Sequence, residues 1–481
     1  MDKKCKYITT TLPYVNDNPH MGHALEFVQA DTLARYWRLM GHEVFFNTGV
    51  DEHGQKIARK ADESKQDRQS YVDYFAKQFG ELKNKLDLSY DNFLRTSSLE
   101  HKAAARELWQ LCLKSGDIYK KRFKGLYCVG CESFKTESDL QAGKCPDHKV
   151  EPEEIEEENY FFRLSKYQSY LEDYLSRTDV IMPEWRRFEA LKFVKNGLED
   201  FSISREKKRV DWGVSVPNDD NHVMYVWFDA LTNYISTLGW PDNKEGEFKK
   251  FWLDGEVLQV AGKDQIRFQS IIWQAMLKSA GIKATDKVIY HGFINSGGHK
   301  MSKSLGNTIS PYELVEKYGT DATRYILLRH VHTFEDTDLT WEKMDEYYTA
   351  NLVNGLGNLT ARIMKMAETN LNPSPTFYKK LAVDRTKNFS YHEAFANFNF
   401  QAVSDDVWQK IQVLDEKITE TEPFKLVKTD KESAGKIIAE LVVSLYEIAD
   451  LLTPLMPQTS TIIRESVLKN KKPNNLFQRL D

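Results

Sequence analysis

The sequence predicts an α/β chain in which an insertion splits a doubly wound parallel sheet and an α-helical bundle follows. Three observations support this fold class. Strand and helix patterns alternate through residues 1–114 and again through about 214–340, which is typical of a parallel sheet covered by helices. A cysteine- and histidine-containing segment lies between these two regions. From about residue 346, long helical patterns with short breaks predict an antiparallel helical bundle.

The first predicted unit is a strand, a tight loop and a helix. The segment "KYITTTLPYV" is rich in β-branched and aromatic residues, and "GHALEFVQADTLARYWRLMG" has helical apolar spacing up to Gly41. His20 and His23 fall on the first helical turn, where N–H groups and the helix dipole favour an anion, and Gly22 allows close approach to the backbone. The segment therefore suits a phosphate chain. The alternative is that both histidines are surface or capping residues.

A zinc site is predicted between the two sheet regions. The candidate ligands are Cys128, Cys131, Cys145 and His148, spaced as C-x2-C, 13 residues, and C-x2-H. Two such tight turns deliver four ligands in the tetrahedral arrangement that zinc prefers. Because the protein fills all four positions, no site is left for water or substrate, and the metal is predicted to be structural.

A lysine-rich loop follows much later in the chain. The stretch "HGFINSGGHKMSKSLGN" places Lys300 and Lys303 three residues apart, after Gly297 and Gly298. Two ammonium groups on such a loop can close over a phosphate chain, although a Lys/Ser/Gly loop is more often only a surface turn. Upstream, an apolar strand ends in Gly262-Lys263-Asp264, a suitable place to hold a ribose.

Composition limits the class of protein. The chain has 481 residues, 41% hydrophobic and 28% charged, and a net charge of −5. These values predict two to four domains and exclude a globally basic nucleic-acid binder, but not a local basic face. Five unevenly spaced cysteines do not form a disulfide framework, so a reducing cytoplasm is expected. The sequence has no apolar run long enough for a membrane span and no signal peptide at its N-terminus.

With these motifs in order, the chain resembles the methionyl-tRNA synthetases, a branch of the class I aminoacyl-tRNA synthetases. The first and last of the matching stretches are the class I signatures, and the others point to methionine. The five stretches are "TLPYVNDNPHMGH", "NTGVDEHG", "YVWFDALTNY", "VAGKDQIRF" and "KMSKSLGN". The resemblance implies a methionine–tRNA ligase, which forms methionyl-adenylate from L-methionine and ATP, releases pyrophosphate and transfers the methionyl group to the 3′ end of initiator and elongator methionine tRNA.

The resemblance also implies a domain scheme and a set of cofactors. A Rossmann-type catalytic domain is expected in two halves, with the zinc knuckle in a connective insertion and an anticodon-binding bundle at the end; the boundaries are 1–114, 115–213, 214–345 and 346–481. The expected cofactors are ATP, Mg²⁺ travelling with ATP, and structural Zn²⁺. Because the chain ends after the bundle, a monomer is expected. The insertion is too small to hold a large editing domain as well, and its closed metal site differs from the substrate-binding zinc of cysteinyl enzymes.

Site residues follow from the same resemblance. The two histidines, His20 and His23, are expected to contact the phosphates in the transition state, and Lys300 and Lys303 to clamp pyrophosphate. Further ATP contacts are expected from Asn18, Gly22, Glu26, Gly262, Asp264, Met301 and Ser302. The methionine pocket is expected to comprise Leu12, Tyr14, Asp51, Val226, Trp227, Ala230, Tyr234, Phe268 and Gln269, with Asp51 binding the ammonium group.

Four departures from the family pattern bear on specificity, two in the pocket and two in the bundle. Many members have histidine where this chain has Gln269, and proline is common at the position of Leu231. In the bundle, which reads the CAU anticodon in the family, the usual Asn-Arg pair is replaced by Glu416 and Lys417, and Phe424 replaces tryptophan. Lys417 and Phe424 are the predicted tRNA contacts, through phosphate attraction and base stacking.

Two other classes of protein remain as alternatives. A small-molecule nucleotidyltransferase shares the histidine signature, but it does not need both a zinc insertion and a helical bundle. A non-catalytic tRNA-binding paralogue is expected to lose the histidines or the lysine loop, and both are present. ATP–pyrophosphate exchange with each amino acid separates the three readings.

Overall fold

The computed structural model describes residues 4–130, 133–135, 137–146, 149–300, 308–372, 377, 381 and 383–480. The chain divides into two compact units. The first unit contains Met1–Pro19, Glu43–Glu81 and Tyr90–Tyr290, and the second contains His20–His42, Leu82–Ser89 and His291–Asp481. Of the helices that the structure describes, none combines the length and the apolar character needed to cross a membrane.

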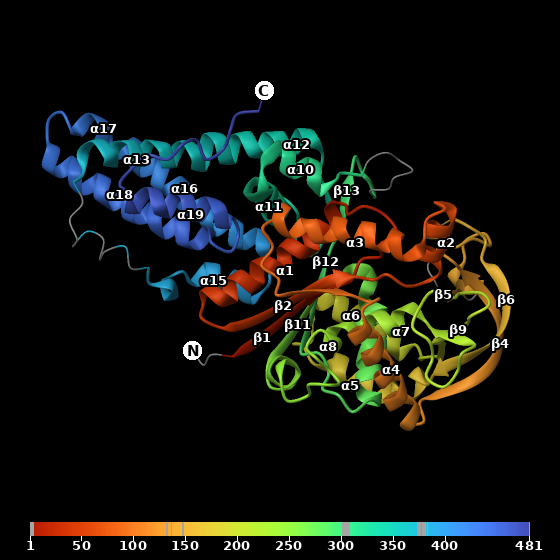
Figure 1. Cartoon of the computed structure of the whole chain (residues 1–481). Helices are drawn as coiled ribbons and strands as arrows, with labels where there is room; N and C mark the ends of the chain where they lie inside the picture. The colour runs from red at the N-terminus through yellow and green to blue at the C-terminus, as the bar shows by residue number, and fades with distance from the viewer. Residues whose placement is uncertain are drawn as a thin grey trace. The chain divides into compact units, whose positions relative to one another are not determined.

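A parallel sheet forms the centre of the first unit (Figure 1). Within the described residues it has six strands in the order β3-β2-β1-β11-β12-β7. Parallel pairing joins β1 to β2 and β11, β2 to β3, and β12 to β7. The strands are β1 Cys5–Thr10, β2 Glu43–Val50, β3 Asn92–Arg95, β7 Ile181–Met182, β11 Glu256–Gly262 and β12 Lys287–His291. Strand order reverses between β1 and β11, and open α/β sheets bind their ligands beyond the carboxyl ends of strands at such a point.

Helices cover this sheet and bury its apolar faces. Tyr7 and Ile8 of β1 and Val257 and Leu258 of β11 are completely buried, so adjacent residues on both strands lack solvent exposure, as expected for strands covered on both sides. The helices of this unit are α2 Gln55–Glu63, α3 Arg68–Lys85, α4 Leu99–Lys114, α5 Gln168–Ser176, α6 Glu184–Lys195, α7 Val226–Leu231, α8 Asn233–Ser236 and α9 Trp273–Ser279. The predicted parallel sheet with flanking helices is therefore confirmed.

A second, antiparallel sheet occupies the region of the predicted insertion. Its strands, in the order β5-β4-β6-β8, are β5 Ser133–Lys135, β4 Ile118–Cys128, β6 Glu153–Phe162 and β8 Phe201–Ser202. A hairpin-like pair, β9 Ser204–Glu206 and β10 His222–Met224, follows. Between β6 and β8 the chain supplies β7 to the central sheet, where Val288 of β12 pairs with Ile181. Residues 115–213 are therefore not one separate block, and the proposed boundaries at 114, 213 and 345 stay predictions.

The second unit is mainly helical, which confirms a helical C-terminal region. Its helices are α1 Met21–Leu39, α10 Pro311–Tyr318, α11 Thr320–Arg329, α12 Trp341–Tyr347, α13 Asn358–Asn370, α15 Phe389–Ala396, α16 Phe400–Thr421, α17 Pro423–Leu426, α18 Lys431–Leu452 and α19 Pro457–Leu468. Helix α18 packs against α13, α16 and α19, and α11 packs against α1, α10 and α16. Strands β13 Ile294–Ser296, β14 His299–Lys300 and β15 Thr337–Asp338 form a small sheet in the same unit.

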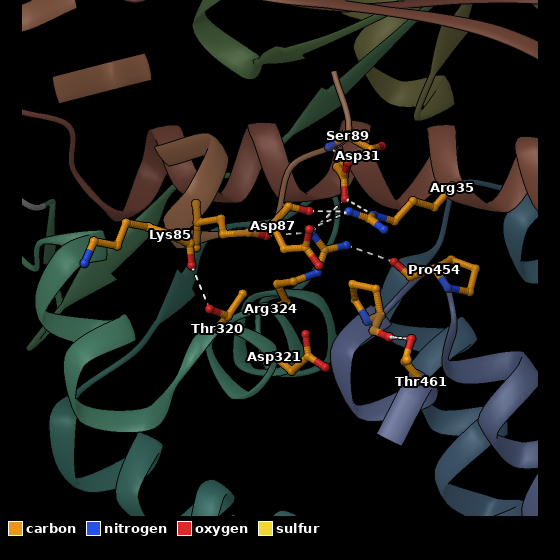
Figure 2. A network of polar contacts seen from close by, with 12 residues as sticks. Asp31, Arg35, Lys85, Asp87, Ser89, Thr320, Asp321, Arg324, Pro454 and Thr461 are labelled. Atoms are coloured by element: carbon orange, nitrogen blue, oxygen red, sulfur yellow. Dashed lines mark hydrogen bonds and ion pairs between the residues drawn. The ribbon is translucent and has the colours of Figure 1, made fainter. Parts of the chain in front are cut away.

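A buried arginine ties these elements together (Figure 2). Arg324 of α11 is completely buried. Its guanidinium donates to the Asp31 carboxylate of α1 at 2.7 Å and to the Leu86 carbonyl at 3.0 Å. On its other side it donates to the Pro454 and Leu455 carbonyls, both at 2.9 Å, in the turn between α18 and α19. One side chain therefore joins four separate segments of the second unit.

Candidate functional site

The loops after β1 and β2 meet beyond the carboxyl ends of these strands. Tyr14 and Asp51 form a parallel bridge there. The Asp51 amide donates to the Pro13 carbonyl at 2.9 Å, and the Val15 amide donates to the Asp51 carbonyl at 3.1 Å. The predicted pocket residues Leu12, Tyr14 and Asp51 thus lie on two adjacent loops at the point where the strand order reverses.

The Asp51 carboxylate is held in one orientation. Asp51 is 2% exposed, and its Oδ1 accepts from the His53 amide at 3.1 Å and from the Thr96 hydroxyl at 3.2 Å. Buried carboxylates are stable only when hydrogen bonds or cations satisfy them. A carboxylate fixed at a sheet edge in this way is suited to an ammonium group.

A buried His–Asp–His cluster supports this loop from behind. Asp229 of α7 accepts from His53 Nδ1 at 2.6 Å and from His101 Nε2 at 2.8 Å, and His101 Nδ1 lies 2.9 Å from the Ser236 hydroxyl. Burial alone would raise the pKa of Asp229, but the two imidazoles hold this pKa at about 2. Asp229 therefore stays ionised and fixes the ring of His53, whose backbone amide orients Asp51.

Aromatic rings stand next to the Asp51 loop. Tyr14 packs edge-on against Trp227 with ring centroids 6.0 Å apart, and Trp227 stacks on Phe268 at 3.8 Å. Phe268 lies on a π-helical turn, Arg267–Ile272, and such turns are frequent at functional sites. The structure thus brings together three of the four aromatic residues that the resemblance assigns to the methionine pocket.

The remaining predicted pocket residues lie on α7, on α8 and on the π-helical turn. Val226 and Ala230 are buried on α7, and Gln269, 1% exposed, donates its Nε2–H to the Tyr234 hydroxyl at 2.7 Å. Gln269, one of the expected departures from the family pattern, is thereby fixed beside Tyr234. Leu231, the other departure on this side, is buried in the hydrophobic core.

Strand β11 ends where the sequence predicts a nucleotide contact. Gly262 is its last residue, and Asp264 is exposed on the short 3-10 turn that follows, Lys263–Gln265. This turn begins at the carboxyl end of the strand next to β1. An exposed carboxylate at this position can accept from ribose hydroxyl groups.

At the N-terminus of α1 the two histidines cap the helix and stack on each other. His20 Nδ1 accepts from the Gly22 amide at 3.1 Å, and His23 Nδ1 accepts from the His20 amide at 3.2 Å. The ring centroids are 3.7 Å apart. The capping alternative therefore describes their backbone contacts. Because both Nδ1 atoms are acceptors, each neutral ring carries its proton on Nε2, which is the atom able to donate to a phosphate oxygen.

The charge state of His23 follows from its surroundings. Burial, the neighbouring ring of His20 and the nearby His291 together lower the pKa of His23 well below its usual value. His23 is thus neutral at physiological pH. A Cβ at Gly22 would lie 3.0 Å from the His20 ring, so glycine at this position leaves room for the imidazole.

Two more predicted ATP contacts differ in exposure. Glu26 is buried on α1, and its Oε2 lies 3.0 Å from His291 Nε2. Glu26 is therefore engaged within the second unit. Asn18 is exposed on the loop before α1, where its amide donates to Asp17 Oδ1.

The glycines of the lysine loop form a tight hairpin turn. Gly297 and Gly298 have φ angles of 64° and 76° and connect the antiparallel strands β13 and β14. Such a two-residue turn with positive φ angles favours glycine. The backbone of Lys300, on β14, pairs with Asn295 of β13. Met301, Ser302 and Lys303 lie outside the described residues, so their predicted roles stay predictions.

Half of the predicted zinc ligands can be located. Cys128 ends β4 and Cys145 follows a turn closed by the Gln141–Lys144 bridge, and both cysteines are completely buried. Cys131 and His148 lie outside the described residues. Among the residues that the structure describes, no cluster of three or more metal-ligating side chains occurs. The two thiols that can be located fit a structural zinc site in type and burial.

Of the predicted tRNA contacts, Lys417 lies near the C-terminal end of α16 and Phe424 lies on α17. Lys417 pairs with Glu440 at 2.8 Å and keeps 38% of its side chain exposed. Phe424 on α17 is 45% exposed, and it follows Glu422, which adopts a left-handed backbone conformation. Both side chains are accessible to a ligand from solvent.

Comparisons with known proteins identify the class. The family described as "tRNA synthetases class I (M)" matches residues 6–154 and 139–364. This match covers more than half of the chain and includes the parallel sheet and its edge loops. The fold and the site thus define a class I tRNA synthetase.

Individual relatives narrow the family. The methionine–tRNA ligase of Caldanaerobacter subterraneus is 40% identical over 95% of this chain and 73% of the relative, and that of a Nostoc species is 40% identical over 96% and 89%. The structure of Mycobacterium tuberculosis methionyl-tRNA synthetase in complex with methionyl-adenylate matches with a TM-score of 0.89 and 35% identity, over 96% of this chain and 93% of the other. The chain belongs to the methionine–tRNA ligase family.

Sequence reasoning missed several residues that shape the site. His53 and Asp229 stand inside two of the quoted motifs, and His291 begins the lysine-rich stretch, yet none was assigned a role. His101 lies in no motif. Motif matching emphasises residues that touch ligand, whereas these residues act on other side chains. The only available signal was a charged or imidazole side chain within an otherwise apolar segment such as "VWFDAL".

We expect Asp229→Asn to lower stability in a pH-dependent way. Because the folded pKa of about 2 lies below the unfolded value of about 4, the ionised carboxylate contributes about 2 kcal/mol above pH 4, and this contribution disappears as pH falls towards 2. Urea unfolding of wild type and variant between pH 6 and pH 3 measures the difference. Glu432→Gln, which alters an exposed pair, is the control. A wild-type-to-variant gap that does not narrow below pH 4 would contradict the assignment.

Proposed function

We propose that this chain activates L-methionine with ATP to methionyl-adenylate, releases pyrophosphate, and transfers the methionyl group to the 3′ end of methionine tRNA. The observation that carries this proposal is the fixed Asp51 carboxylate next to the Tyr14–Trp227–Phe268 rings. A carboxylate suits the substrate ammonium group, and aromatic walls suit the polarizable thioether of methionine. The family to which the chain belongs and the order of the motifs in its sequence support the same activity.

The chemical step needs positioned charge more than a covalent catalyst. A carboxylate oxygen of methionine attacks the α-phosphorus of ATP. A bond forms between this oxygen and the phosphorus, and the bond between the phosphorus and the pyrophosphate oxygen breaks. The Nε2–H groups of His20 and His23 donate to phosphate oxygens, while Lys300 and Lys303 neutralise the departing pyrophosphate. The neutral state of His23 fits a hydrogen-bond donor that need not lose a proton.

The other proposed nucleotide contacts divide by role. Asp264 accepts from the ribose, and Gly262 gives the base access to the end of β11. Magnesium would accompany ATP and would supply positive charge to its phosphates. Glu26 acts on the site through His291 rather than by direct contact, because the two side chains pair with each other. The contacts proposed for Asn18, Met301 and Ser302 rest on the resemblance.

Methionine specificity is proposed to depend on packing. An apolar pocket discriminates by only about 1–3 kcal/mol per methylene, so the aromatic walls have to fit the side chain closely. Leu12 and Tyr14 meet the sulfur in this proposal, and Trp227 and Phe268 enclose the chain. Gln269 fixes Tyr234 by its hydrogen bond and thereby sets the shape of the remaining wall.

ATP–pyrophosphate exchange tests the proposal. Exchange is expected with methionine and not with the other standard amino acids. Lys303→Ala is expected to reduce the methionine-dependent rate by at least about 10²-fold, because one cationic contact acts mainly in the transition state. Lys436→Ala, on the exposed surface of α18, is the matched control. Near-normal exchange by Lys303→Ala would remove the lysine loop from the mechanism.

The same assay separates the alternatives. A small-molecule nucleotidyltransferase would show no exchange that depends on an amino acid. A non-catalytic tRNA-binding protein would show no exchange at all. Location in the cytoplasm and a monomeric state stay predictions from the sequence.

We further propose a structural zinc ion held by Cys128, Cys131, Cys145 and His148. Zinc would cross-link the turn after β4 to the turn after Lys144. The ion would supply no catalytic chemistry, because the four protein ligands close its coordination. The complete burial of Cys128 and Cys145 supports this role.

Elemental analysis tests the zinc assignment. One zinc per chain is expected, and Cys131→Ser is expected to lower that content. Chelation should impair tRNA charging more than adenylate formation, since the proposed ligands lie outside the adenylate site. Cys112→Ser is the control, because Cys112 is buried in the hydrophobic core of the first unit. A wild-type protein without zinc after gentle purification, or a Cys131→Ser variant with unchanged zinc content, would contradict the assignment.

The bundle is proposed to read the CAU anticodon. Substituting Lys417 and Phe424 together with alanine should weaken charging of methionine tRNA through lost phosphate attraction and base stacking, each worth about 1–3 kcal/mol. Exchange without tRNA should stay close to wild type. The matched control replaces another exposed lysine and phenylalanine, Lys436 and Phe389. Equal charging of a CAU tRNA and a changed-anticodon version would instead favour recognition through the acceptor arm.

A further inference from the structure

Helix α6 exposes three large aromatic side chains. Trp185, Phe188 and Phe193 are 47%, 53% and 41% exposed, whereas Arg187, Ala190 and Val194 face the interior. At about 100° per residue, the three aromatic positions fall within an arc of about 140° on one side of the helix. Exposed apolar side chains are ordinary when scattered singly, but a group on one helix face indicates a binding surface.

Two arginines lie next to these rings: Arg187 is buried beneath Phe188, and Arg267 is exposed beside Phe193. The Arg187 guanidinium lies 4.5 Å from the Phe188 ring centroid, and that of Arg267 lies 5.5 Å from the Phe193 ring centroid. Lys192 and Lys195 are exposed on the same helix. The structure shows no ion-pair partner among the described residues for Lys192, Lys195 or Arg267. We name the side chains of Trp185, Phe188, Lys192, Phe193, Lys195 and Arg267 the aromatic–basic face.

The acidic residues of α6 do not neutralise this face. Glu184 pairs with Arg187 at 3.0 Å, and Glu189 pairs with Arg186 at 2.6 Å. Each acidic group of the helix is thus matched by an arginine. The charged side chains of α6 for which the structure shows no ion pair within the residues it describes, Lys192 and Lys195, are therefore positive, although the whole chain has a net negative charge.

The topology puts this face beside the methionine pocket. Strand β7 runs parallel to β12, and α6 begins two residues after β7 ends, so α6 leaves from the carboxyl edge of the sheet. Helix α6 also packs against the π-helical turn Arg267–Ile272. Arg267 of the face is followed directly by Phe268 of the pocket wall. The face and the pocket therefore share one structural element within the first unit.

We propose that the aromatic–basic face binds the single-stranded 3′ end of the tRNA. The inference rests on the proposed function, since the 3′ end has to reach methionyl-adenylate at the carboxyl edge of the sheet. Nucleic-acid single strands bind where aromatic rings stack on bases and a basic surface follows the backbone. A protein partner fits less well, because lysine is depleted in the centre of protein interfaces.

Two RNA hairpins provide the probe. One carries an acceptor-stem duplex with a single-stranded ACCA 3′ end, and the other is the same duplex with a blunt end. Fluorescence anisotropy measures the affinity of each for the full chain. The double variant Trp185→Ala/Phe188→Ala should bind the tailed hairpin at least about tenfold more weakly, because each lost stacking contact is worth about fivefold or more. Its affinity for the blunt hairpin should not change.

Matched variants separate stacking from folding. Trp185→Phe keeps an aromatic ring and should restore most of the affinity that Trp185→Ala loses. Tyr74→Ala removes an equally exposed ring, 56% exposed, from α3 and should leave binding unchanged. Replacing both Lys192 and Lys195 with glutamine should reduce the slope of log affinity against log salt by about 1.4, or about 0.7 for each lost phosphate contact to a single strand.

The outcomes distinguish this inference from the proposed function. Methionine-dependent pyrophosphate exchange needs no tRNA and should be normal in Trp185→Ala/Phe188→Ala. Normal exchange with unchanged affinity for the tailed hairpin overturns the inference and leaves the function standing. Absence of exchange in the wild type overturns the function itself. A change of oligomeric state without a change in RNA affinity assigns the face to protein contact and also overturns the inference.

Discussion

The contact on which the second unit depends is the buried ion pair between Arg324 and Asp31. Arg324 uses both sides of its guanidinium, because it pairs with α1 and also donates to carbonyls in the turn before α19. Burial would raise the pKa of Asp31, but Arg324 and Arg35 hold it below its usual value. Removal of either partner would leave an uncompensated buried charge, which typically costs about 3–5 kcal/mol. Helix α1, which His20 caps, is thus held against the helical bundle.

The first unit also contains a buried carboxylate that side chains from distant segments satisfy. Asp229 is a fully buried carboxylate that two imidazoles from distant segments satisfy. His53 connects this cluster to the loop of Asp51, so the orientation of the Asp51 carboxylate depends on a charge buried behind it. In each unit, one buried carboxylate specifies how several segments meet. Apolar packing alone tolerates more than one arrangement, whereas an unmatched buried charge does not.

Much of this organisation could be predicted from local sequence. Strand β1 and helix α1 follow from apolar spacing, and the pocket aromatic residues follow from motifs. The return of the chain to the central sheet at β7 could not be predicted, because two strand residues, Ile181 and Met182, give no periodic signal. The reciprocal capping by His20 and His23 was foreseen only as an alternative, since the same residue types serve an anion site and a helix N-terminus. The partners of Arg324 lie up to 293 residues away, and local patterns carry no information at that range.

The substitution of glutamine at position 269 has a consequence for the chemistry of the pocket. A histidine can gain a proton as pH falls, and its hydrogen-bonding role and charge then change, although burial moves this change to lower pH. The amide of Gln269 has no such titration, and it donates to Tyr234 in a fixed direction. Trp227 and Phe268, which stack on each other, are also neutral at all relevant pH values. The polarity of these walls of the proposed pocket therefore does not change with pH, and Asp51 is the ionised group proposed to recognise the substrate. Under the proposed assignment, discrimination among amino acids depends on shape and polarizability at the aromatic end of the pocket and on the Asp51 carboxylate at the other end.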